Sequence, residues 1–87
     1  MKAVEIYTKS YCPYCQRAKE LLRIKGVGFT EYDITQDAVK EAEMRQRSGR
    51  QTVPEIFIGG VLVGGCSDLF DQDETGELDR LLGLRTP

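Results

Sequence analysis

The sequence predicts an α/β fold in which helices flank a four-stranded mixed sheet, in the order β-α-β-α-β-β-α. Strand-like and helix-like runs alternate through the first half of the 87 residues, a pattern typical of parallel strands joined by helices. In the second half, Gly59-Gly60 separates two short β-prone runs, as in a two-residue hairpin. We expect residues 1–87 to form a single domain, because a second one has no room. Residues 84–87 are expected to be a loose tail.

The first three elements follow from alternation and from helix end signals. A strand is expected over residues 3–8, where apolar and polar residues alternate. A helix should follow over residues 13–25, because proline suits its first position and Gly26 supplies the stop. Residues 28–34 alternate again and predict a strand parallel to the first, since a helical crossover joins the two.

A second helix is predicted by a charged run of helix-forming residues over residues 35–48, which ends at Gly49. Its apolar face is thin, because Ala38, Val39 and Ala42 are the residues available to form it. We therefore expect this helix to be a largely solvated cover.

The second half is predicted to contain two antiparallel strands, over residues 55–58 and 61–63. A short helix should start near Ser67, and residues 78–82 predict a last helical segment whose leucines pack back on the sheet. We expect the aromatic side chains of the chain's regular elements to pack in the core or on a sheet face: Tyr7, Phe29, Tyr32, Phe57 and Phe70.

Composition excludes several classes of partner. With a net charge of −2 and an isoelectric point of ≈ 5.1, the chain has no basic stripe, so nucleic acid is not an expected partner. No segment approaches the length of a membrane span, and the chain runs directly into a strand without a signal-peptide pattern. We expect a cytoplasmic monomer that binds no membrane.

The chemistry is indicated by Cys12-Pro13-Tyr14-Cys15, which lies between the first strand and the first helix. Cys12 falls at or beside the helix N-cap, where unpaired backbone N–H groups and the helix dipole favour a thiolate. Cys15 lies about one turn further on, with its sulfur near that of Cys12 but directed inward. We expect Cys12 to be the nucleophile and Cys15 the resolving thiol of a redox pair.

Two other interpretations of the cysteines are weaker. A structural zinc site normally needs four ligands, whereas this chain offers only Cys66 besides the pair, and no histidine. A structural disulfide across two residues would remove little entropy from the unfolded chain. We therefore expect no metal, and reduced thiols with one working pair.

Two further motifs accompany the Cys-Pro-Tyr-Cys motif: Thr52-Val53-Pro54 and Gly64-Gly65-Cys66-Ser67-Asp68. Together the three motifs resemble a dithiol glutaredoxin over nearly the whole chain, at the mutual distances that this family uses. The resemblance implies the thioredoxin-like fold, with catalytic Cys12 and Cys15. It also implies that ten residues bind glutathione: Lys9, Tyr14, Gln51, Thr52, Val53, Pro54, Gly65, Cys66, Ser67 and Asp68.

The resemblance implies a cis peptide bond before Pro54, which would place the Val53 backbone opposite the active-site sulfurs. There it could pair with the backbone of a peptide-like substrate, as a short strand does. Lys9 and Gln51 are placed near the glycyl carboxylate of glutathione, and Tyr14 beside its cysteinyl sulfur. All of these are expectations from the family.

The third motif matches the γ-glutamyl end of glutathione, which carries a carboxylate and an ammonium group on one carbon. The backbone N–H groups of Cys66 and Ser67 at a helix start can receive the carboxylate, and Asp68 can meet the ammonium. Many glutaredoxins have two aspartates where this chain has Ser67-Asp68, and we expect Ser67 to cap the helix instead. Cys66 is either a buried apolar group or a third thiol near the groove.

The expected activity is glutathione-dependent reduction of protein–glutathione mixed disulfides through Cys12, and of protein disulfides through Cys12 and Cys15. Partners are glutathione, glutathionylated or disulfide-containing proteins, and ribonucleotide reductase as one such client. Two alternatives stay open: an electron donor reduced by thioredoxin reductase, and a carrier in which two chains share an iron-sulfur cluster through Cys12 and bound glutathione. Pro13 and Cys15 count against the carrier.

Overall fold

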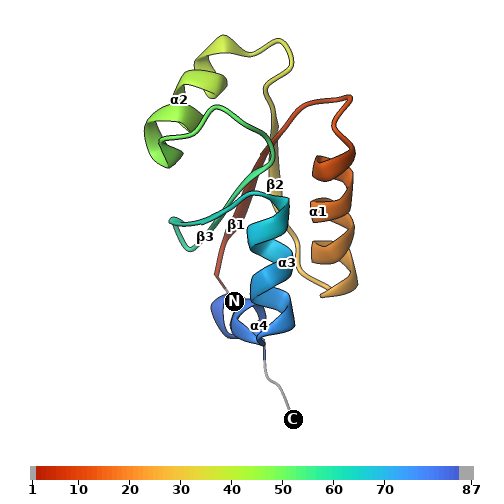
Figure 1. The fold of residues 1–87 in the computed structure, drawn as a ribbon. Coiled ribbons are helices and arrows are strands. Elements are labelled where there is room, and N and C mark those ends of the chain that lie inside the picture. The colour runs from red at the N-terminus through yellow and green to blue at the C-terminus, as the bar shows by residue number, and fades with distance from the viewer. Residues whose placement is uncertain (1, 85–87) are drawn as a thin grey trace.

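The computed structural model describes residues 2–84, which form a four-stranded sheet with helices on both faces (Figure 1). The strand order is β2-β1-β3-β4. The elements in chain order are β1 (Val4–Thr8), α1 (Pro13–Ile24), β2 (Thr30–Asp33), α2 (Ala38–Ser48), β3 (Glu55–Ile58), β4 (Val61–Gly64), α3 (Cys66–Glu74) and α4 (Glu77–Leu82). β1 pairs parallel with β2 and antiparallel with β3, and β4 is antiparallel to β3, so the predicted mixed sheet is confirmed. Within these residues, no helix is both long and apolar enough to cross a membrane.

One face of the sheet packs against α1, α3 and α4. Ala18, Leu21 and Leu22 form the buried face of α1, as their spacing predicts. They meet side chains from the sheet and from the last two helices: Val4, Ile6, Ile56, Ile58, Val63, Leu69, Leu78 and Leu82. This apolar cluster fixes α1 against the sheet, and with it the position of the residues that begin α1.

The other face of the sheet packs against α2 through a mixed aromatic and charged cluster. Tyr7 and Phe57 are buried there, and Met44 is the buried residue of α2. The Arg47 guanidinium lies 4.0 Å from the Phe57 ring centroid, bonds the Tyr7 hydroxyl at 2.7 Å and pairs with Glu5 at 3.0 Å. A charged side chain therefore does much of the packing between α2 and the sheet.

The prediction that Ala38, Val39 and Ala42 form the buried face of α2 is wrong. Ala38, Val39 and Ala42 are exposed, and the side that faces the sheet instead carries Met44 and Arg47. The helix also begins later than predicted, because the Asp37 side chain accepts the N–H of Lys40 and caps the first turn. The face of α2 that packs on the sheet is therefore formed by Met44 and the aliphatic part of the Arg47 side chain, not by the small apolar residues.

Three further expectations are corrected. Phe70 is 39% exposed and lies at a groove between α1 and α3, because α3 buries Leu69 instead. Leu84 is not loose, since it packs against the core and its N–H bonds the Asp79 carbonyl at 2.9 Å. The rest of the predicted tail, residues 85–87, lies outside the described residues. Strand β2 is shorter than predicted, and Phe29 before it is half-buried against the core.

Replacing Arg47 with glutamine is expected to lower the free energy of unfolding by about 1–3 kcal/mol at pH 7, because Glu5 and Tyr7 lose a half-buried donor. The hydrogen bond from Arg47 holds the pKa of Glu5 below its ordinary value of 4.5. This stabilisation is therefore complete above that pH and is lost as the pH falls through the lowered pKa. Urea unfolding at neutral and acidic pH should show the difference between variant and wild type shrinking in acid.

The matched control is Arg45→Gln on the same helix. Arg45 forms an exposed pair with Glu41, so its loss should cost less than about 1 kcal/mol. Equal losses in the Arg45 and Arg47 variants, or a loss at Arg47 that does not change with pH, would contradict the role of the buried network.

Candidate active site

The first helix begins at the predicted nucleophile. Cys12 is the N-cap of α1, and Pro13 is its first helical residue. The Cys12 sulfur accepts the backbone N–H of Cys15 at 3.1 Å and lies 3.8 Å from the Val53 carbonyl oxygen. Because an N–H donor stabilises a thiolate, the geometry supports the activation predicted for Cys12.

Cys15 lies in a different environment from Cys12. Its side chain is fully buried in α1, whereas Cys12 is partly exposed. Burial, followed by the adjacent Cys12 sulfur, raises the pKa of Cys15 to about 12, although the backbone N–H of Lys9 opposes this. Cys15 is therefore a neutral thiol at physiological pH, and the prediction that it is directed inward is confirmed.

A groove of ≈ 290 Å³ is lined by Val53, whose carbonyl oxygen lies 3.8 Å from the Cys12 sulfur. The Val53–Pro54 peptide bond at its wall is cis, as predicted from the family resemblance. The groove brings together seven of the ten residues predicted to bind glutathione: Tyr14, Thr52, Val53, Pro54, Gly65, Cys66 and Ser67. Residues from three separate segments of the chain thus share one surface.

The start of α3 forms the far end of this groove. Gly65 is the N-cap, and the helix begins at Cys66, one residue before the predicted start near Ser67. The expectation that Ser67 caps the helix is wrong, because Ser67 is already the second helical residue. The Asp68 carboxylate, in the first turn, accepts the Gly65 N–H at 2.9 Å. That hydrogen bond, followed by one from Arg50, lowers the pKa of Asp68, so it is a carboxylate at neutral pH.

Two charged residues next to Asp68 were not predicted. Arg50 lies 3.0 Å from the Asp68 carboxylate and 3.8 Å from Glu55 Oε1. Glu55 is fully buried, accepts the Thr52 hydroxyl at 3.2 Å, and leaves Oε1 without a hydrogen bond. Burial raises the pKa of Glu55. A single charge in an otherwise apolar strand was the signal that could have identified Glu55.

The remaining predicted site residues lie at the margin. Lys9 contributes its backbone N–H to Cys15, and Gln51 is exposed just before Thr52, but neither lines the groove. Cys66 is half-buried at the groove, and burial raises its pKa. Its environment thus lies between the two that the sequence left open.

Among residues 2–84, no cluster of three or more histidine, cysteine or acidic side chains is arranged to hold a metal ion. The free dithiol Cys12/Cys15 at a helix start faces a cis-proline loop on a β-α-β-α-β-β-α-α fold. That combination defines a thiol–disulfide oxidoreductase with the thioredoxin-like fold.

Comparisons with known proteins specify the class further. A family model described as glutaredoxin matches residues 4–63. The chain is 57% identical to glutaredoxin 3 of Escherichia coli over 82 residues, covering 94% of this chain and 99% of that protein. It is 48% identical to a glutaredoxin of Pseudomonas aeruginosa, covering 94% and 98%. The chain therefore belongs to the glutaredoxin family, whose members are glutathione-dependent thiol–disulfide oxidoreductases.

Solved structures agree in fold. A buckwheat glutaredoxin–glutathione complex aligns with a TM-score of 0.87 at 30% identity, covering 94% of this chain and 77% of that one. The solution structure of glutaredoxin from Brucella melitensis aligns with a TM-score of 0.82 at 50% identity, covering 99% and 96%. The predicted thioredoxin-like fold and family are thus confirmed.

Replacing Gly64 with alanine is expected to lower the free energy of unfolding by about 1–3 kcal/mol. Gly64 has a φ of 122°, and an added Cβ would lie 2.8 Å from Asp68 Cγ and 2.9 Å from Arg50 Nη1. The control is Gly65→Ala, whose Cβ would meet its nearest neighbour, the Pro54 carbonyl oxygen, at an ordinary 3.5 Å. Urea unfolding should show a loss for Gly65→Ala below about 1 kcal/mol, and the reverse order would contradict this geometry.

Proposed function

We propose that this chain reduces protein–glutathione mixed disulfides through Cys12 alone. The Cys12 thiolate attacks the glutathione sulfur, a Cys12–glutathione disulfide forms, and the leaving protein thiolate takes a proton from solvent. The thiolate of a second glutathione then attacks the same glutathione sulfur, which releases glutathione disulfide and restores Cys12. The observation that carries the proposal is the N–H of Cys15 directed at the Cys12 sulfur beside the groove.

For protein disulfides we propose a dithiol route. Cys12 first forms a mixed disulfide with one protein sulfur and releases the other as a thiol. Cys15, after losing its proton, attacks the Cys12 sulfur, so that a Cys12–Cys15 disulfide forms and the second protein thiol leaves. Two glutathione molecules then reduce the pair. The buried, protonated state of Cys15 supports this division, because it leaves Cys12 as the attacking thiolate.

Glutathione is proposed to bind in the groove with its cysteinyl backbone against Val53. Its γ-glutamyl carboxylate would meet the N–H groups of Cys66 and Ser67, whose place at the start of α3 suits an anion. Its ammonium would meet Asp68, a carboxylate by virtue of its lowered pKa. Tyr14 and Thr52 would line the cysteinyl end, and Lys9 and Gln51 would approach the glycyl carboxylate.

Arg50 is proposed to compete with this ligand. Its guanidinium lies where the ammonium would meet Asp68, at 3.0 Å from the carboxylate. When it leaves Asp68, the neighbouring Glu55 Oε1 offers a second acceptor that has no hydrogen bond. Arg50 would thus exchange its contact with Asp68 for a closer one with Glu55, which already lies 3.8 Å from the same Nη1 atom.

Single substitutions of Cys12 and Cys15 should affect the two proposed routes differently. Cys12→Ser is expected to abolish both routes, because the attacking sulfur is lost. Cys15→Ser should retain the reduction of a glutathionylated peptide and lose the glutathione-dependent reduction of a protein disulfide. The measurement is NADPH oxidation coupled through glutathione reductase, repeated with thioredoxin reductase in place of glutathione and its reductase. Activity of Cys12→Ser on the glutathionylated peptide, or turnover by thioredoxin reductase alone, would sink the proposal.

If Arg50 competes with the ammonium group for Asp68, substitutions of Arg50 and Glu55 should change KM in opposite directions. Arg50→Gln should lower KM for a small glutathione mixed disulfide by roughly threefold, because Asp68 is then free. Glu55→Gln should raise KM, since Arg50 loses its second acceptor, and the double variant should behave like Arg50→Gln alone. A rise in KM for Arg50→Gln would show that Arg50 assists binding rather than competing with it.

The clients of the dithiol route are proposed to include the active-site disulfide of ribonucleotide reductase. Such a client is an exposed dithiol that must be reduced after each turnover, which suits a small reductant with one accessible sulfur. A cytoplasmic location is proposed with it, because three unpaired cysteines in a chain of this size suit a reducing compartment. Glutathione-dependent turnover of oxidised ribonucleotide reductase by this protein is the direct test.

A further inference from the structure

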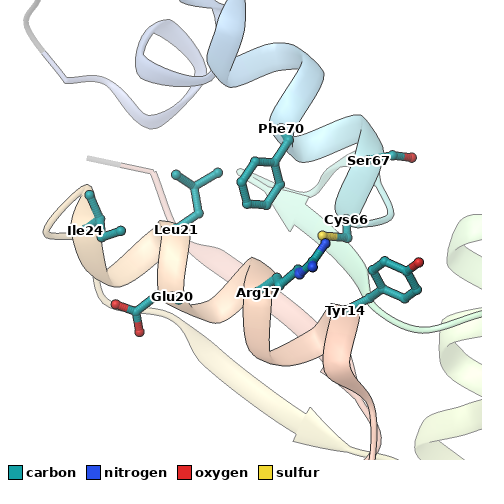
Figure 2. A pocket seen from close by; sticks show the side chains of 8 residues that line it. All are labelled: Tyr14, Arg17, Glu20, Leu21, Ile24, Cys66, Ser67 and Phe70. Carbon is teal, nitrogen blue, oxygen red and sulfur yellow. The ribbon is translucent and has the colours of Figure 1, made fainter.

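A second groove, of ≈ 470 Å³, runs between α1 and α3 (Figure 2). Leu21 and Ile24 line it from α1, and Phe70 faces them from α3. Ile24 is 72% exposed and Phe70 is 39% exposed, so apolar surface that the core does not use lies open along this groove.

This α1–α3 groove is continuous with the groove beside Cys12. Tyr14, Cys66 and Ser67 line both of them. Along α1, Tyr14 and Ile24 mark the two ends, about 15 Å apart at a rise of ~1.5 Å per residue. A segment of roughly four or five extended residues spans that length. The groove thus has the dimensions of a short peptide segment that starts at the active site.

Two charged side chains line this groove, Arg17 and Glu20. Figure 2 shows the Arg17 side chain reaching from α1 toward Cys66, between the apolar residues and Tyr14. Among the ion pairs formed within residues 2–84, none includes Arg17, whereas Glu20 at the rim pairs with Arg23 at 3.7 Å. The Arg17 guanidinium lies 5.8 Å from the Tyr14 ring centroid and pairs with no carboxylate of the described residues, so it is available for a ligand carboxylate.

We propose that the α1–α3 groove binds the protein half of the mixed disulfide. The residues next to the modified cysteine would lie along it, with an apolar side chain on Leu21 and Phe70 and a carboxylate at Arg17. This inference rests on the function proposed for Cys12. In that proposal the glutathione half of the mixed disulfide lies in the other groove. The two grooves then divide one substrate between them, and the residues they share lie at the boundary.

A peptide segment fits this surface better than a second copy of the chain. Stable dimers normally bury more than about 1,000 Å², over a broad and flat patch. Here the apolar surface is a groove that also holds the Arg17 cation, and the chain carries a net charge of −2. An extended acidic segment satisfies both features, because its apolar side chains fill the groove while its carboxylate meets Arg17.

The test compares three substrates in the coupled glutathione assay. One is a glutathionylated peptide with leucine and aspartate beside the cysteine, and its match has serine and asparagine in the same places. The third is the mixed disulfide of glutathione and 2-mercaptoethanol, which has no peptide segment. Wild type is expected to show a kcat/KM for the leucine–aspartate peptide about tenfold above that for its match.

Phe70→Ser and Arg17→Gln should each remove most of that advantage. Turnover of the small mixed disulfide should stay at the wild-type value in both variants. Ile24→Ser provides a second change at an exposed site in case Phe70→Ser folds poorly. The matched control is Val39→Ser, because Val39 is 79% exposed on α2, outside the groove. It should leave all three substrates unchanged.

The outcomes separate this inference from the function on which it rests. Failure of wild type to turn over the small mixed disulfide would overturn the function proposed for Cys12. Normal turnover with no preference between the two peptides would overturn the groove assignment alone. So would an equal loss on all three substrates in the variants. A concentration-dependent dimer that Phe70→Ser dissociates, seen by sedimentation, would assign the groove to self-association and would overturn the inference as well.

Discussion

The chemistry of this chain depends on the hydrogen bond that the backbone N–H of Cys15 donates to the Cys12 sulfur. The bond exists because α1 begins at Pro13, so that the next N–H groups of the helix lack internal partners and point at the N-cap. It persists because Ala18 and Leu22 are fully buried against the sheet and hold α1 in place. A redox sulfur on a loop would have neither advantage. The rigid core and the reactive group are thus parts of one arrangement.

The opposite face of the sheet is held to α2 by hydrogen bonds around Tyr7. Burial, followed by a hydrogen bond to Glu43, raises the pKa of Tyr7 to about 12, so the phenol stays neutral and serves as a hydrogen-bonding hub. Arg47 joins this hub to α2, which has only Met44 to bury. The loop that follows α2 brings Arg50 to Asp68 at the end of the groove. The charged cluster behind the sheet therefore helps to place the chain segment that enters the candidate site.

The fold and most of the site could be predicted because their signals are local or periodic. Alternation and end signals identified the strands and the N-cap position of Cys12, and the groove residues followed from the family resemblance that the three motifs carry. The features that could not be predicted depend on tertiary packing, which decides which of several similar side chains is buried. Neighbouring residues Leu69 and Phe70 are both apolar, and only packing decides which is buried. Likewise α3 begins one residue earlier than predicted, so Gly65 rather than Ser67 is its N-cap, and the Asp68 carboxylate accepts the Gly65 N–H.

The three thiols illustrate how position in the fold sets reactivity. Cys15 is shut into the core, and burial raises its pKa; burial also raises the pKa of Cys66, at the boundary of the two grooves. Only Cys12 combines exposure with an N–H donor at its sulfur. An incoming disulfide therefore meets one competent nucleophile, with a groove on either side of the boundary at Cys66. Because the proposed chemistry gives each groove a different substituent of that disulfide, a domain this small would recognise both halves of its substrate around a single sulfur.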